Sequence, residues 1–168
     1  MIPDTAATPA SQARSDRLGI WAALGLQLVG YFVDVAWHGL VPLDAEPATR
    51  RDMMIHLITV HAMLYIGAAC VLIMIARAMV HRASRSAILD APYALAVGPL
   101  AVALAGAVVS AGAEAWHASS HLHLDIKHAS VAGVLSLVGY LVATGATIVG
   151  GWRARRQGSG PVSRRHAA

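Results

Sequence analysis

Two short stretches of the chain place a carboxylate just ahead of a Trp-His pair. Asp34 lies four residues before His38, and Glu114 lies three residues before His117. Residues three or four apart share one face of a helix, so each carboxylate lies on the same face as its histidine. Carboxylates together with neutral imidazoles suit copper, iron, zinc or manganese ions. We therefore expect these four side chains to contribute to a metal site.

Each Trp-His pair is followed along the chain by two histidines spaced five apart. Positions five apart on an α-helix differ by about 140°, so both members face one way only if the helix begins between them or unwinds. Which member of each pair is a ligand therefore stays open. His121 and Asp125 are weaker candidates, because the segment around them reads as a solvated loop. The predicted metal ligands are Asp34, His38, His56, His61, Glu114, His117, His123 and His128.

The composition indicates that these residues sit in a membrane protein. Of the 168 residues, 57% are hydrophobic and 13% are charged, whereas soluble domains average about 25% charged residues. The net charge of +4 could suit nucleic acid, but most basic residues flank apolar runs or lie in the tails. We expect a lipid bilayer and no nucleic acid as partner. The single Cys70 excludes an internal disulfide and argues against a thiolate metal site.

Four apolar runs are long enough to cross a bilayer, which takes about 20 residues. Backbone groups in lipid must pair internally, so the runs should be helices, and glycines in every run favour close packing. We expect an all-α, integral membrane, antiparallel four-helix bundle. Residues 1–17 and 153–168 should form disordered cytoplasmic tails. The expected spans are 18–41, 53–80, 93–116 and 126–152.

The basic residues predict the orientation of this bundle. Three of the thirteen Lys and Arg residues (Arg50, Arg51 and Lys127) fall in the first and third connections, and the other ten fall in the tails and the middle connection. Basic residues accumulate on the cytoplasmic side. We therefore expect a multi-pass protein of the inner or plasma membrane, with both termini cytoplasmic. All eight predicted ligands would then lie toward the periplasmic or extracellular side.

The two halves of the chain resemble each other. Trp-His occurs at Trp37–His38 and at Trp116–His117, and His-x4-His follows in both halves. The pattern predicts two repeated helical hairpins, with the histidines near a pseudo-two-fold axis along the membrane normal. The carboxylates differ by one position, since Asp34 is three residues before its tryptophan and Glu114 two.

The donor set favours a site for one or two metal ions with redox or oxygen-dependent chemistry, as in a membrane metal-dependent oxidoreductase. Di-iron bundles use two Glu-x-x-His motifs and two further Glu residues, so this histidine-richer set fits copper first, then iron or zinc. A b-type haem between facing histidines is a further alternative. Others are a metal-binding, delivery or transport protein, and an accessory subunit that packs against a membrane partner or a second copy. An enzyme should have a cavity beside the cluster, and a delivery protein an exposed site around His121 and His123.

The stretch from Asp34 to His38 is similar to a ligand motif in one of the membrane subunits of particulate methane and ammonia monooxygenases. The resemblance covers five residues, and the short chain with four spans departs from that family. It implies copper near the periplasmic side of the spans.

Overall fold

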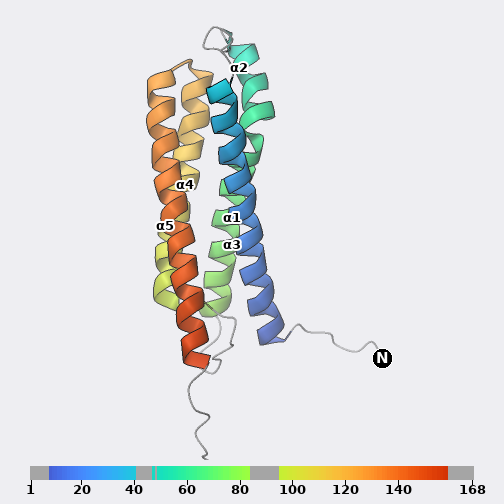
Figure 1. The fold of residues 1–168 in the computed structure, drawn as a ribbon, viewed down its shortest axis with the longest axis vertical. Helices are drawn as coiled ribbons and strands as arrows, with labels where there is room; N and C mark the ends of the chain where they lie inside the picture. The colour runs from blue at the N-terminus through green and yellow to red at the C-terminus, as the bar shows by residue number, and fades with distance from the viewer. Residues whose placement is uncertain (1–7, 41–46, 48, 84–94, 159–168) are drawn as a thin grey trace, which may run out of the picture.

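The computed structural model of the chain describes residues 8–40, 47, 49–83 and 95–158, and every element in these ranges is helical. The chain has four long helical segments, called rods below, which lie side by side in a bundle (Figure 1). The second rod is continuous over Arg50–Ala83 and contains three elements. α1 packs along α3, α3 along α4, and α4 along α5. The elements are α1 (Pro9–Leu40), α2 (Arg50–His56), the π-helical turn η2 (Leu57–His61), α3 (Ala62–Ala83), α4 (Val97–Leu122) and α5 (Ile126–Gly158).

The expectation of four long apolar helices is confirmed, and all four are long and apolar enough to cross a membrane. The helices run past the apolar segments that predict them. α1 begins at Pro9, within the expected N-terminal tail, and α5 continues to Gly158. Thr8 explains the early start, because its hydroxyl accepts the N–H of Ser11 at 3.3 Å and proline is favoured at the first helical position. The remaining tail residues, 1–7 and 159–168, lie outside the described residues.

Glycines let the helix backbones approach closely. A Cβ atom on Gly67 of α3 would lie 2.5 Å from the Cα of Gln27 on α1, and one on Gly139 of α5 would lie 2.6 Å from the backbone of Gly106 and Ser110 on α4. Any side chain at these positions would push the backbones apart. Small residues therefore set the α1–α3 and α4–α5 spacing, as is common where helices pack in a bilayer.

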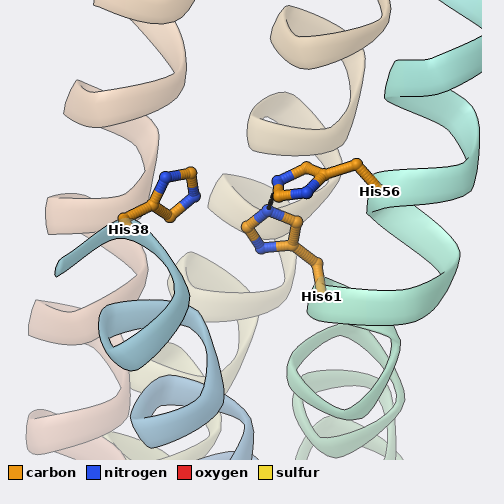
Figure 2. Close-up of side chains that lie close together, drawn as sticks. All are labelled: His38, His56 and His61. Atoms are coloured by element: carbon orange, nitrogen blue, oxygen red, sulfur yellow. Dashed lines mark hydrogen bonds between the residues drawn. The ribbon is translucent and has the colours of Figure 1, made fainter. Parts of the chain in front are cut away.

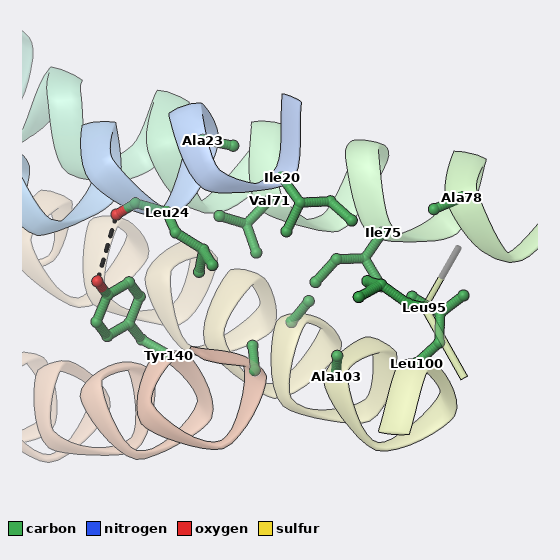
Figure 3. Close-up of a cluster of buried hydrophobic side chains, with 12 residues drawn as sticks. Ile20, Ala23, Leu24, Val71, Ile75, Ala78, Leu95, Leu100, Ala103 and Tyr140 are labelled. Carbon is green, nitrogen blue, oxygen red and sulfur yellow. Dashed lines mark hydrogen bonds between the residues drawn. The ribbon is translucent and has the colours of Figure 1, made fainter. Parts of the chain in front are cut away.

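An apolar core fills the part of the bundle between Asp16 and Gln27 of α1. It includes Ile20, Leu24, Val71 and Leu100, and the hydroxyl of Tyr140 donates to the carbonyl of Leu24 at 3.3 Å (Figure 3). Large apolar side chains also lie exposed along all four rods. A surface of this kind is typical of helices that face lipid.

Polar clusters lie on either side of this core. Below it, the buried Asp16 contacts His81 at 2.7 Å and Arg77 at 3.1 Å. Above it, Gln27 donates to Ser110 at 2.8 Å, and Ser110 contacts Ser136 at 3.1 Å. Pairing of this kind lowers the cost of burying polar side chains within the bundle.

Candidate metal centre

A π-helical turn brings His56 and His61 together. In a π-helix the hydrogen bonds join residues five apart, so positions five apart stack over one another. The chain adopts this geometry over Leu57–His61, and both imidazoles are buried with their Nε2 atoms 3.0 Å apart (Figure 2). The hydroxyl of Thr59 donates to the carbonyl of Ile55 at 2.9 Å and so supports a turn that the α-helical ladder leaves incompletely paired.

α4 contributes two further buried histidines to the same place. It continues to Leu122 rather than ending near Trp116, so His121 lies one turn beyond His117 on the same face. Their Nε2 atoms are 2.9 Å apart. The ring centroid of His61 lies 5.1 Å from that of His117 and 5.2 Å from that of His121. The histidine pairs of η2 and α4 therefore form one cluster.

His38 at the end of α1 completes the cluster from the partly exposed side. Its ring centroid lies 5.5 Å from that of His56 and 5.7 Å from that of His61, and Figure 2 shows these three rings turned toward one another. Two overlapping groups of three imidazoles arise, and in each the ligand nitrogens lie within 4.8 Å of one another. The groups are His38, His56 and His61, and His61, His117 and His121.

The two carboxylates lie behind the histidines. Asp34 Oδ1 is 3.0 Å from Nδ1 of His61 and 3.4 Å from Nε2 of His38. Glu114 Oε2 is 3.4 Å from Nδ1 of His117. A carboxylate at Nδ1 fixes the ring orientation and leaves Nε2 for a metal ion. The Nε2 atoms of His61 and His117 are the ones that face the other histidines.

The spacing of the imidazole nitrogens suits a metal ion. Two nitrogens held at about 2.0–2.1 Å from one ion lie about 2.9 Å apart at a right angle and about 3.3 Å apart at a tetrahedral angle. The two Nε2–Nε2 distances of 3.0 Å and 2.9 Å fall in this range. Within the described part of the chain, the buried Nδ1 of His121 and Oε1 of Glu114 have no hydrogen-bond partner.

Tyr65 lies beneath the cluster, one helical turn from His61. Its ring stacks on that of His61 with centroids 5.7 Å apart, and it meets the ring of His117 edge-on at 6.3 Å. Among the described residues its buried hydroxyl finds no hydrogen-bond partner. By sequence alone Tyr65 is most simply a core residue, although its spacing of four from His61 places it on the same face.

A cleft of about 310 Å³ adjoins the histidines on the side where α1 and α5 meet. Asp34, His38, His117 and His121 form one wall, and apolar residues of α5 form the other. The hydrogen bond between Tyr31 Oη and Ser136 Oγ, 2.6 Å long, joins α1 to α5 at its inner end. A partly apolar hollow with converging polar groups is the usual form of a small-molecule site.

His123 and His128 lie outside this cluster. Both are exposed, with His123 just after α4 and His128 in the first turn of α5. Between them Leu124 takes a left-handed conformation with φ of 59°. Nδ1 of His123 lies 2.7 Å from the carbonyl oxygen of Ser119, and Nδ1 of His128 lies 2.5 Å from Asp125. The backbone N–H of His128, with its imidazole, holds the pKa of the Asp125 carboxyl below its ordinary value.

The structure thus gathers six of the eight predicted residues and adds His121. The signal for His121 was present in the sequence, because it follows His117 by four residues, the spacing of same-face pairs. The sequence-based prediction ended the third span at Trp116, where the apolar run ends, and therefore placed His121 in a loop.

Comparison of the chain with protein-family models, with curated proteins and with solved structures found no match.

Proposed function

We propose that this chain is an integral membrane metalloprotein, an antiparallel four-helix bundle whose histidine cluster binds copper, or else iron or zinc. The observation that carries the proposal is the pair of Nε2–Nε2 contacts, 3.0 Å in η2 and 2.9 Å in α4. Four buried imidazoles this close together are the expected form of ligands around an ion. Burying so many titratable rings without a ligand would cost free energy that a bound ion offsets.

The side chains have distinct roles in this proposal. The ligands are His56, His61, His117 and His121, with His38 closing the site from the cleft. Asp34 and Glu114 act as positioning residues that hold Nδ1 of His61 and His117. This set leaves out His123 and His128, which the sequence predicted as ligands. Because they are exposed, they serve as comparison residues.

The donor chemistry supports copper first. Imidazole suits copper, zinc and iron, and copper(II) stands highest in the affinity order of the divalent ions. The lone Cys70 lies in α3, more than two helical turns beyond His61 in the sequence, so the cluster is built without thiolate. A redox-active ion in such a site supports electron transfer or oxygen-dependent chemistry on a bound molecule.

Four observations favour a metal enzyme over the alternatives. A cleft adjoins the cluster, as an enzyme needs. The ring centroids of His56 and His61 lie 4.8 Å apart and those of His117 and His121 lie 4.6 Å apart, so these rings contact one another instead of facing each other across a haem. The apolar core between Gln27 and Asp16 carries few polar side chains, whereas a transporter would require a polar path along the bundle. The buried position of His121 also differs from the loop-borne site of a delivery protein.

The membrane arrangement follows from charge. Ten of the thirteen Lys and Arg residues fall in the tails and the middle connection, and three fall at the histidine end. By the positive-inside rule both termini are cytoplasmic and the metal site lies toward the periplasmic or extracellular side.

Elemental analysis with an optical spectrum on protein purified in detergent tests the proposal. Wild-type protein should carry one or two ions per chain. His61→Ala should lose them, because His61 belongs to both three-histidine groups, and His128→Ala, which removes an exposed histidine, should retain them. A Soret band would replace the proposal with the haem alternative. Metal-free wild-type protein after growth with copper, iron and zinc, or equal metal in both variants, would refute it.

A further inference from the structure

We propose that the cleft between α1 and α5 binds a small, uncharged, lipid-soluble molecule that carries a hydroxyl or carbonyl group and enters sideways from the bilayer. The inference rests on the proposed function for the position of the bundle in a membrane and for the chemistry done to the molecule. The binding itself follows from the cleft.

The shape of the cleft depends on Gly133. A Cβ atom there would meet only Cε1 of His117, at 3.9 Å, which is ordinary van der Waals contact. Gly67 and Gly139 are required by neighbouring backbone, but helix packing does not require Gly133. Its missing side chain leaves open space directly beside His117, one of the proposed ligands.

The polar wall of the cleft suits a neutral head group. Asp34 offers acceptor oxygens, and the imidazoles of His38 and His121 can donate or accept a hydrogen bond. The Tyr31 hydroxyl, which also lines the cleft, is already bonded to Gln27 and Ser136. Lys and Arg do not occur among the described lining residues, so an anionic head group such as a phosphate would meet Asp34 without a compensating cation. A hydroxyl or carbonyl group finds partners here, and an anion does not.

The rim of the cleft is apolar and faces outward. Val35 of α1 is 68% exposed and Val134 of α5 is 63% exposed, and both line the cleft. Leu137 lies one turn further along α5 on the same side. A molecule that reaches this opening crosses an apolar surface, so it comes from lipid rather than from water. The volume of about 310 Å³ is at the small end of ligand sites, which selects a single ring or a short chain.

Phenol is a suitable probe because it combines one ring with one hydroxyl. Metal-free protein carrying isotope-labelled histidine would be titrated with phenol, and the Cε1–Hε1 resonance of His117 followed by NMR. We expect a saturable shift at His117 and none at His81, which lies on the other side of the apolar core. Fluorobenzene, which has a similar size and no hydroxyl, should bind more weakly, because the polar wall then loses its partner.

Gly133→Leu should weaken phenol binding by about tenfold or more, because the added side chain takes the apolar space that the ring would occupy. Gly145→Leu is the matched control, since Gly145 lies on the same helix with nothing within 4 Å of its Cβ position. Leu137→Trp is a second blocking variant, needed in case Gly133→Leu disturbs the fold. It narrows the opening of the cleft away from Gly133 and should also weaken phenol binding. Circular dichroism checks that each variant keeps its helices.

The inference is overturned if His117 shows no saturable shift, if His81 shifts equally, or if the two blocking variants bind phenol as the wild type does. If fluorobenzene binds as tightly as phenol, the cleft does not select for a hydroxyl or carbonyl group, and that part of the inference is wrong. Because the titration uses metal-free protein, its failure leaves the metal analysis of the same variants unaffected, and a failure of the metal proposal leaves the titration interpretable.

Discussion

The Nε2 atoms of His56 and His61 lie 3.0 Å apart although five residues separate them in the chain. In an α-helix the two rings would point about 140° apart. The π-helical turn over Leu57–His61 removes this difference. A π-turn is equivalent to one extra residue in an α-helix and is often found at functional sites, so the position of the extra residue can be tested directly.

Removing one residue from the π-turn should preserve metal binding, whereas adding one residue should abolish it. Deleting Thr59 gives His-x3-His, which an α-helix places on one face, so bound metal should be retained. Inserting an alanine after Thr59 separates the histidines by six positions, and about 240° on an α-helix, so metal should be lost. Metal per chain after gel filtration, with helical content as the control, decides the matter. Loss in the deletion and retention in the insertion would contradict the assignment of the pair.

Asp34→Asn and Glu114→Gln should weaken metal affinity by about 10–100-fold, the usual effect of removing a carboxylate that orients a ligating histidine. His61→Ala should lose more, because it removes a ligand. Competition with a chelator of known affinity measures the difference. Asp52→Asn is the matched control, since Asp52 contacts Thr49 at the start of α2 instead of the cluster. A loss in Asp34→Asn as large as that in His61→Ala would make Asp34 a direct ligand, as the sequence pattern predicted.

Gly67→Ala should destabilise the bundle by about 1–3 kcal/mol, the range for overpacking a close contact. Its Cβ would fall 2.5 Å from the Cα of Gln27, so the α1 and α3 backbones must separate. Gly25→Ala should have little effect, because nothing lies within 4 Å of that Cβ position. Thermal unfolding in detergent compares the two variants. Equal melting temperatures would mean that α1 and α3 are not held this closely in the membrane.

A reporter fused to the C-terminus should lie in the cytoplasm, because most basic residues fall on that side. A fluorescent protein at this end should fold and fluoresce, and an alkaline phosphatase should remain inactive. The reverse pattern would invert the proposed orientation and place the histidine end in the cytoplasm.

The Asp125 carboxyl, in the turn between α4 and α5, should stay ionised to a lower pH than an ordinary carboxyl. Hydrogen bonds from the His128 backbone N–H and imidazole lower the pKa of Asp125 below its ordinary 3.8. A carboxyl group whose pKa is lower in the folded than in the unfolded state stabilises the fold at any pH above its unfolded pKa. This contribution is lost as the pH falls through its folded pKa. A carbon-13 NMR titration of the Asp125 carboxyl should therefore show a midpoint below 3.8, and His128→Ala should raise it. An unchanged midpoint in the variant would exclude His128 as the cause.

The sequence predicted the four helices because apolar runs of this length have few other structures available in a chain of this composition. It also predicted that His38, His56, His61 and His117 would cluster. The π-turn could not be predicted, because the hydropathy pattern does not show where a helix changes from α-helical to π-helical hydrogen bonding. His121 was undervalued because the polar segment that carries it continues α4 instead of forming a loop.

The one-residue difference between the two carboxylates has a geometric counterpart. Glu114 contacts the histidine of its own helix, His117. Asp34 lies one position further from its tryptophan and contacts His61 on the neighbouring rod as well as His38. The segment between the two histidines of each His-x4-His pair also differs. It is a π-helical turn between His56 and His61, and it is the connection from α4 to α5 between His123 and His128. The internal repeat itself stays a prediction.

The apolar core that separates the histidine cluster from Asp16 and His81 has an electrical consequence. Among the described residues, the core is filled mainly by apolar side chains, with few polar groups between the two polar ends. If an ion binds the imidazoles as proposed, the protons that it displaces should leave at the histidine end of the bundle. In the proposed membrane arrangement, a voltage along the bundle would act on few titratable groups among the described residues of the core. The proposed site would then exchange ions and protons with one compartment alone.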